Sequence, residues 1–147
     1  MFEHIVAAID DDTIRRGRVI DATLAVAAAL KASVVVAHVR ELERQVTMGR
    51  PTTVVPTTTP LVMEDESLAR TIVSEAVRRL QEAGVEATGV IREGGGQTAK
   101  ELLEVAEEND ADLVVVGDRG VHLTNLVLGN VAHRIVHGAP CPVLLVR

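Results

Sequence analysis

Two groups of residues in this chain have types and spacings that could do chemistry, a glycine cluster and a run of aspartates. Gly117 and Gly120 follow an apolar run, and Gly129-Asn130 stands where a helical pattern begins. The free backbone amides of a glycine loop and of a helix start attract phosphate groups. Arg119 lies in the same loop and could add positive charge. The spacing is neither GxGxxG nor GxxxxGK[ST], so a dinucleotide fingerprint and a P-loop are both excluded.

The aspartates, residues 10–12, directly follow the apolar run 4–9. Ligands of parallel sheets bind beyond the carboxyl ends of the strands, where the strand order reverses. If the first and fourth strands are neighbours there, the aspartates face the glycine loop across one crevice. Asp10 is then the candidate for a ribose contact or a bridging Mg²⁺. The alternative is that Asp11, Asp12 or Thr13 simply caps the following helix.

Four other patterns are weaker candidates for a functional site. The glycines 94–96 are typical of a plain turn between a strand and a helix. His133, His137 and Cys141 have a loose zinc-like spacing, but no fourth ligand stands nearby in the sequence. GxSxG is missing, so no nucleophile elbow is present. Cys141, flanked by prolines at a strand entry, is interpreted as a packed thiol rather than a nucleophile.

The elements that must position these residues follow from hydrophobic periodicity. Short β-branched or apolar runs predict buried strands, and longer patterns with helical spacing predict helices. Gly84 is expected to cap the second helix, and Thr98-x-x-Glu101 resembles a capping box that opens the third. The predicted strands are 4–9, 33–39, 85–91, 112–116 and 142–146, and the predicted helices are 13–31, 64–83, 98–109 and about 128–137. Such alternation favours an α/β fold, a parallel sheet with helices on both faces.

Length and composition favour a single domain over residues 1–147, with an aliphatic core. With Phe2 as the only aromatic residue and a net charge of −6, binding to nucleic acid is disfavoured. One cysteine permits no intrachain disulfide and suits a reducing compartment. Neither a signal peptide nor an apolar run of about 20 residues is found. We therefore expect a cytoplasmic protein without a membrane segment.

Two further segments carry expectations of their own. Residues 44–63 contain three prolines and six threonines, which predicts a flexible loop between the second strand and the second helix. A lid, a docking segment or a phosphorylated loop are the alternatives for this segment. The last strand is expected to lie at an exposed sheet edge, where pairing protects it. We therefore predict a homodimer through Val143 to Val146.

Four stretches together resemble the universal stress protein family. They are HIVAAIDDD at the start, VVVAHV in the second strand, the long run IREGGGQTAKELLEVAEENDADLVVVGDRG, and LGNVAHRIVHGAPCPVLLV at the end. The resemblance covers nearly the whole chain in order. It implies an open five-stranded parallel sheet in the order 3-2-1-4-5, like that of the adenine-nucleotide alpha hydrolases, and a dimer through the last strand.

Many members of that family bind ATP or AMP through the pattern G-x2-G-x9-G-[ST] after the fourth strand. Carried over, Gly117 and Gly120 match the first pair and Gly129 matches the last glycine, while Asp10 and Val39 match positions that meet the nucleoside. Two departures stand out. Eight residues separate Gly120 from Gly129 instead of nine, and Asn130 replaces Ser or Thr. A branch of the family lacks the full motif and does not bind ATP.

The leading hypothesis is a dimeric, cytoplasmic stress-response sensor or regulator that binds ATP or AMP, with Mg²⁺ accompanying ATP, and is not an enzyme. The expected nucleotide-binding residues are Asp10, Val39, Gly117, Arg119, Gly120, Gly129, Asn130 and Val131. The alternative is a dimerisation or adaptor module whose crevice is closed to nucleotides. A slow ATPase is the third hypothesis, although the sequence supplies no clear base to position a water molecule.

Overall fold

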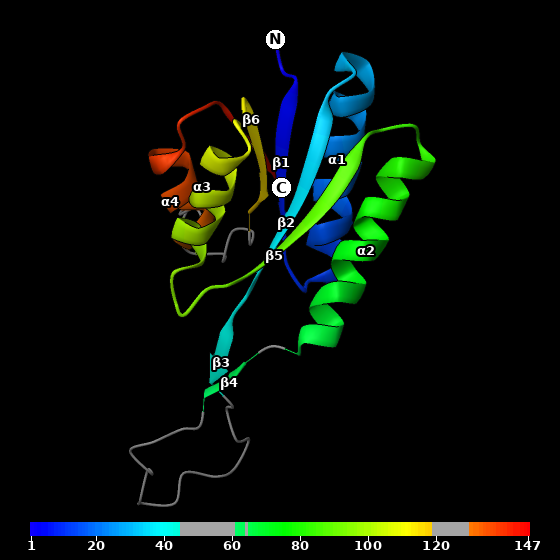
Figure 1. Ribbon diagram of the computed structural model, residues 1–147. Coiled ribbons are helices and arrows are strands. Elements are labelled where there is room, and N and C mark those ends of the chain that lie inside the picture. Colours follow the sequence, from blue (N-terminus) through cyan, green and yellow to red (C-terminus); the bar gives the residue numbers. More distant parts are fainter. Residues whose placement is uncertain (45–60, 64, 119–129) are drawn as a thin grey trace, which may run out of the picture.

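The computed structural model describes residues 1–44, 61–63, 65–118 and 130–147 (Figure 1). Of the residues predicted to bind nucleotide, Arg119, Gly120 and Gly129 lie outside the described residues. Within the described part, no helix combines the length and the apolar character that crossing a membrane requires.

A parallel sheet forms the centre of the molecule. Its strands are β1 (His4–Ile9), β2 (Ser33–Arg40), β5 (Ala87–Glu93), β6 (Leu113–Gly117) and β7 (Val143–Val146). They form a five-stranded sheet in the order β5-β2-β1-β6-β7, and every neighbouring pair is parallel. Counted along the sheet strands alone this is 3-2-1-4-5, so the predicted topology is confirmed. The order reverses between β1 and β6, which places the carboxyl ends of these two strands side by side.

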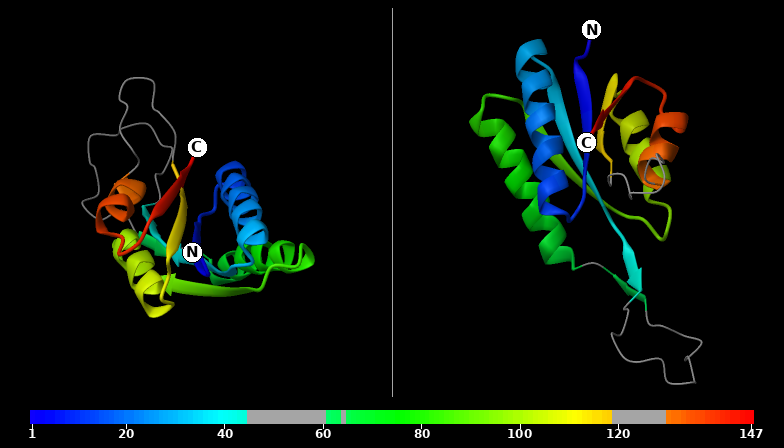
Figure 2. Two further views of the ribbon diagram at one scale, coloured as in Figure 1. Left: turned by 90° about the horizontal axis from the view of Figure 1, so that it is seen from above. Right: turned by 180° about the vertical axis from the view of Figure 1, so that it is seen from behind.

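Four helices cover the two faces of the sheet. They are α1 (Thr13–Leu30), α2 (Glu66–Glu82), α3 (Thr98–Glu108) and α4 (Asn130–Gly138). Alternate residues of β1 divide between two cores: Ile5 packs with residues of α1 and α2, whereas Val6 packs with residues of α3 and α4. Viewed from above, α1 and α2 lie on one side of the sheet and α3 and α4 on the other (Figure 2). The predicted α/β architecture is therefore correct.

A short antiparallel pair, absent from the sequence prediction, extends beyond the sheet. It joins β3 (Leu42–Arg44) to β4 (Leu61–Met63). The prediction of a flexible loop over 44–63 is therefore wrong at both ends, because Arg44 and residues 61–63 belong to these strands. The rest of the segment, residues 45–60, lies outside the described residues.

Helix ends agree with the sequence in two places and differ in one. Asp12 is the N-cap of α1, and its carboxylate accepts a hydrogen bond from the Arg15 amide at 2.8 Å. Gly84 follows the end of α2 with φ of +84°, as expected of a capping glycine. The predicted capping box is wrong: α3 has Gln97 as N-cap without a side-chain bond, and the Thr98 hydroxyl instead donates to Glu41 at 3.1 Å.

Candidate functional site

A crevice opens where β1, β2 and β6 end, between the first turns of α1, α3 and α4. Four of the predicted nucleotide-binding residues meet there: Asp10, Val39, Gly117 and Val131. The full lining is Ala8, Ile9, Asp10, Asp11, Arg15, Arg16, Val19, His38, Val39, Glu41, Thr98, Leu102, Val116, Gly117, Val131 and Ala132. Asn130 lines an adjoining hollow that shares Glu41, Thr98 and Val131 with this crevice. The crevice thus brings together the sequence-predicted residues from both sides of the topological switch.

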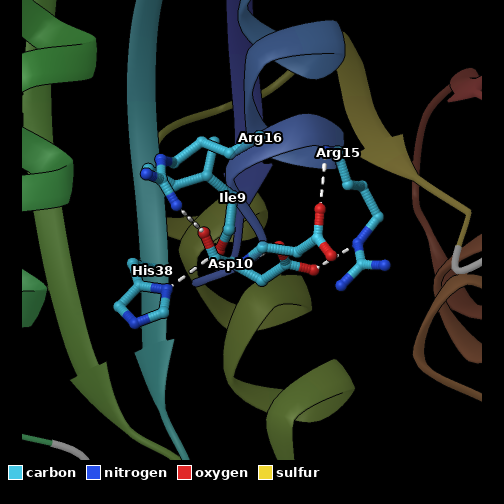
Figure 3. A network of polar contacts seen from close by, with 6 residues as sticks. Ile9, Asp10, Arg15, Arg16 and His38 are labelled. Atoms are coloured by element: carbon cyan, nitrogen blue, oxygen red, sulfur yellow. Dashed lines mark hydrogen bonds and ion pairs between the residues drawn. The ribbon is translucent and has the colours of Figure 1, made fainter.

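Both carboxylate oxygens of Asp10 accept a hydrogen bond in the structure. Its Oδ1 accepts the Asp12 amide at 3.0 Å, and its Oδ2 accepts Nε–H of Arg15 at 2.6 Å. The Asp10 side chain is 33% exposed and the Arg15 side chain 19%, so this ion pair is partly shielded from water. Arg16 donates from Nη1 to the Asp10 backbone carbonyl at 3.0 Å (Figure 3). A ligand that uses Oδ2 of Asp10 must therefore compete with Arg15.

The position of Gly117 has a steric reason that the sequence does not reveal. A Cβ atom there would lie 2.6 Å from Cγ of Arg15 and 3.1 Å from Cγ2 of Val19. Real Cβ contacts are not that short, so any other residue would push the arginine stem away. Gly117 therefore lets Arg15 pass close over the end of β6 on its way to Asp10.

His38 forms part of the crevice wall next to β1. The side chain is 3% exposed, and Nδ1 lies 2.9 Å from the backbone oxygen of Ile9. A carbonyl oxygen only accepts, so Nδ1 carries the proton in this contact. This bond ties the end of β1 to β2 and helps to fix the backbone from which Asp10 projects.

Val39 and Glu41 form the β2 side of the crevice. Gly94, just after β5, packs so closely that a Cβ atom there would lie 2.7 Å from Cγ1 of Val39. The glycines 94–96 form the predicted turn before α3, with Gly95 and Gly96 at φ of +50° and +84°. Val39 offers an apolar surface and Glu41 a carboxylate, a combination suited to the face and the polar edge of a base.

Sequence reasoning missed Arg15, Arg16 and His38. The two arginines stand in the first turn of α1, which contains no acidic residue. Positive charge is disfavoured at a helix N-terminus because the helix dipole is positive there. That mismatch is the signal that could have revealed them, since arginines in such a place need a nearby anion, and Asp10 is that anion.

Two ionisable groups, Asp12 at the start of α1 and Cys141 before β7, have pKa values displaced from their ordinary ones. The hydrogen bond from the Arg15 amide is the main reason that the pKa of Asp12 lies below its ordinary value. Burial, followed by the negative charge of Asp112, raises the pKa of Cys141, as suits a packed thiol. Within the described residues, no group of three or more His, Cys, Asp or Glu side chains could hold a metal ion.

Comparison with known proteins shows to which family this chain belongs. The model of the universal stress protein family matches residues 1–147. The chain belongs to the universal stress protein family. This universal stress protein is 30% identical over 152 residues to YxiE of Bacillus subtilis strain 168, a match that covers 100% of both chains.

Solved structures of other universal stress proteins share the fold. One is the protein from Archaeoglobus fulgidus in complex with dAMP, with a TM-score of 0.70, 22% identity, and coverage of 100% of this chain and 98% of that one. Another is a universal stress protein in complex with cAMP, with a TM-score of 0.68, 22% identity, and coverage of 99% and 97%. At these identities the likeness shows the common fold of the family.

Proposed function

We propose that this universal stress protein binds an adenine nucleotide, ATP or AMP, in the crevice between β1 and β6. The observation that carries the proposal is the meeting of Asp10, Val39, Gly117 and Val131 at the carboxyl ends of the parallel strands. Ligands of open parallel sheets bind at this place, where the strand order reverses. Relatives of the same fold that were solved with dAMP and with cAMP support an adenine nucleotide as the ligand.

Each part of the crevice suits one part of a nucleotide. Val39 contacts the base, Asp10 accepts from the ribose hydroxyls, and Gly117 with the amides of Asn130 and Val131 approaches the phosphates. Amides at the start of α4 are suited to phosphate because the helix dipole is positive at that end. The contributions of Arg119, Gly120 and Gly129 belong to the same proposal.

We propose a sensor or regulator rather than an enzyme. Both oxygens of Asp10 are already engaged, by Arg15 and by the Asp12 amide, so this carboxylate is poorly placed to activate water. A Mg²⁺ ion accompanying ATP would compete with the Arg15 guanidinium for the negative charge of the Asp10 carboxylate. The proposal includes a cytoplasmic homodimer that pairs through β7.

A second candidate, an adaptor module that binds no nucleotide, is favoured by one observation. Arg15 and Arg16 line the crevice, and both bond to Asp10 (Figure 3). If these contacts persist, they close the crevice, and the protein acts through its surfaces alone. This candidate predicts normal folding without any response to nucleotides.

Titration calorimetry with ATP, AMP and cyclic AMP separates the two candidates, supported by thermal-shift measurements with and without Mg²⁺. The proposed function predicts a saturable heat and a raised melting temperature, because a ligand that binds only the folded state stabilises it. Neither heat nor thermal shift at millimolar nucleotide would refute it and leave the adaptor function.

A further inference from the structure

We propose that Arg15 makes the crevice selective for phosphorylated nucleosides, by leaving Asp10 to bind the phosphate nearest the sugar. This rests on the proposed function and adds to it a residue, a ligand class and an exchange of partners. In the exchange, the phosphate takes the Arg15 guanidinium, and the released Asp10 oxygen accepts a ribose hydroxyl. The crevice thereby recognises the phosphate charge and the ribose of the nucleotide in one exchange of partners.

The location of Arg15 supports this role. Its stem passes over Gly117, the first glycine of the proposed phosphate loop, and its Nε–H is bonded to Asp10, the proposed ribose residue. The Arg15 side chain therefore reaches from Gly117 to Asp10. It lies on the side of Asp10 opposite to His38 and Arg16 (Figure 3).

The guanidinium also has donors to spare. An arginine guanidinium has five N–H donors, and of those of Arg15 only Nε–H is recorded in a hydrogen bond within the described residues. Its planar fork matches a phosphate, which can accept two parallel bonds. A phosphate also carries more negative charge than the single carboxylate it displaces, so the exchange is electrostatically favoured.

A nucleoside without phosphate lacks this advantage. It offers no anion to Arg15, so Asp10 Oδ2 stays with the arginine and is a poorer acceptor for the ribose hydroxyls. A divalent cation is not needed for the exchange, because the arginine supplies the positive charge that Mg²⁺ would otherwise bring. The inference is therefore that AMP binds tightly, adenosine weakly, and neither responds to chelation of metal.

The test compares adenosine and AMP by calorimetry, in EDTA and in Mg²⁺, for the wild type, Arg15→Gln and Arg18→Gln. Arg18 is an exposed residue of the same helix, so its substitution removes the same charge outside the crevice. We expect the wild type to bind AMP about tenfold or more tightly than adenosine, the gain typical of charge-assisted hydrogen bonds. Arg15→Gln should lose this preference, because it weakens AMP binding and frees Asp10 Oδ2 for the ribose of adenosine, and Arg18→Gln should retain it.

The outcomes separate the inference from the proposed function. If Arg15→Gln binds AMP as the wild type does, or weakens AMP and adenosine equally, the inference is wrong and nucleotide binding stands. If the wild type binds neither ligand, the proposed function fails and the inference with it. Should Arg15→Gln not fold, as judged by circular dichroism, Arg15→Met takes its place. That variant keeps an unbranched stem over Gly117 but removes the charge and every donor of the guanidinium, and an unchanged preference for AMP would overturn the inference.

Discussion

At the scale of single residues, Gly117 shows how one residue can satisfy two requirements. Its position after β6 matches the family's phosphate-binding pattern, and its missing side chain gives Arg15 a path to Asp10. The second requirement is a matter of packing, because the nearest arginine atom is Cγ, close to the backbone and unable to swing aside easily. Gly117 is therefore tied to the arginine as well as to any ligand.

Gly117→Ala is predicted to displace Arg15 and to destabilise the fold by about 1–3 kcal/mol, as overpacking does. Gly17→Ala is the matched control, because a Cβ at Gly17 meets nothing within 4 Å. In the middle of α1 that change should stabilise by about 0.5–1 kcal/mol. Urea denaturation of both variants measures the difference, and equal stabilities would contradict the packing role of Gly117.

The sequence predicted those site residues that depend on their place at the end of a strand. Asp10, Val39 and Gly117 follow from the strand pattern and the family resemblance, and the structure brings them together. Arg15 and His38 could not be predicted in the same way, because their partners, Asp10 and the Ile9 carbonyl, are defined only by the tertiary fold.

At the scale of elements, the start of α1 combines a good cap with an unfavourable charge pattern. Asp12 accepts the Arg15 amide and so satisfies one of the free N–H groups at the helix end. Arg15 and Arg16 oppose the helix dipole, and the negative charges of Asp10 and Asp12 offset them. The helix start is thus stabilised by ionised aspartates.

Asp12 is predicted to contribute to stability only where its carboxyl is ionised. Its pKa in the folded protein is lowered, so its contribution is complete above the ordinary pKa and disappears as the pH falls through the lowered folded value. Asp12→Asn keeps the cap but should flatten this dependence between neutral pH and pH 3, whereas Asp12→Ala should also lose stability at neutral pH. Denaturation midpoints across that range measure both effects. A pH profile of Asp12→Asn parallel to that of the wild type would refute the prediction.

Helices and strands could be predicted from the sequence where a single hydrophobic pattern runs through the whole element. Continuous apolar runs identified four of the five sheet strands because a strand covered on both faces must be apolar throughout. The run that predicted β5, VEATGVI, is interrupted by Glu86, Thr88 and Gly89. β3 and β4 were not predicted because each has only three residues, next to a stretch rich in proline and threonine, and three residues are too few to show a hydrophobic periodicity. Thr98 was misassigned because its hydroxyl finds a tertiary partner, Glu41, in place of the helix backbone.

At the scale of the whole molecule, β7 leaves one side of the sheet without a partner in the described chain. The backbone oxygen of Pro142 accepts a hydrogen bond from Val114 of β6 at 3.0 Å, and that of Val146 accepts one at 2.8 Å from Asp118, directly after β6. In a parallel ladder, bonding alternates along the strand. The N–H groups of Val143 and Leu145 therefore face away from β6, toward the predicted second copy of the chain.

Leu145→Pro tests this predicted dimer while sparing the bonds between β6 and β7. Proline is tolerated where the N–H faces outward from an edge strand, but it cannot donate to a partner. Because both copies change, the loss of a hydrogen bond on each side should weaken the dimer about tenfold or more. Leu145→Ala loses the side chain but keeps the N–H, so it controls for reduced packing.

Sedimentation velocity over a range of concentrations should find dimers for the wild type and Leu145→Ala and monomers for Leu145→Pro. Undiminished dimers of Leu145→Pro would place the contact elsewhere than the outer edge of β7.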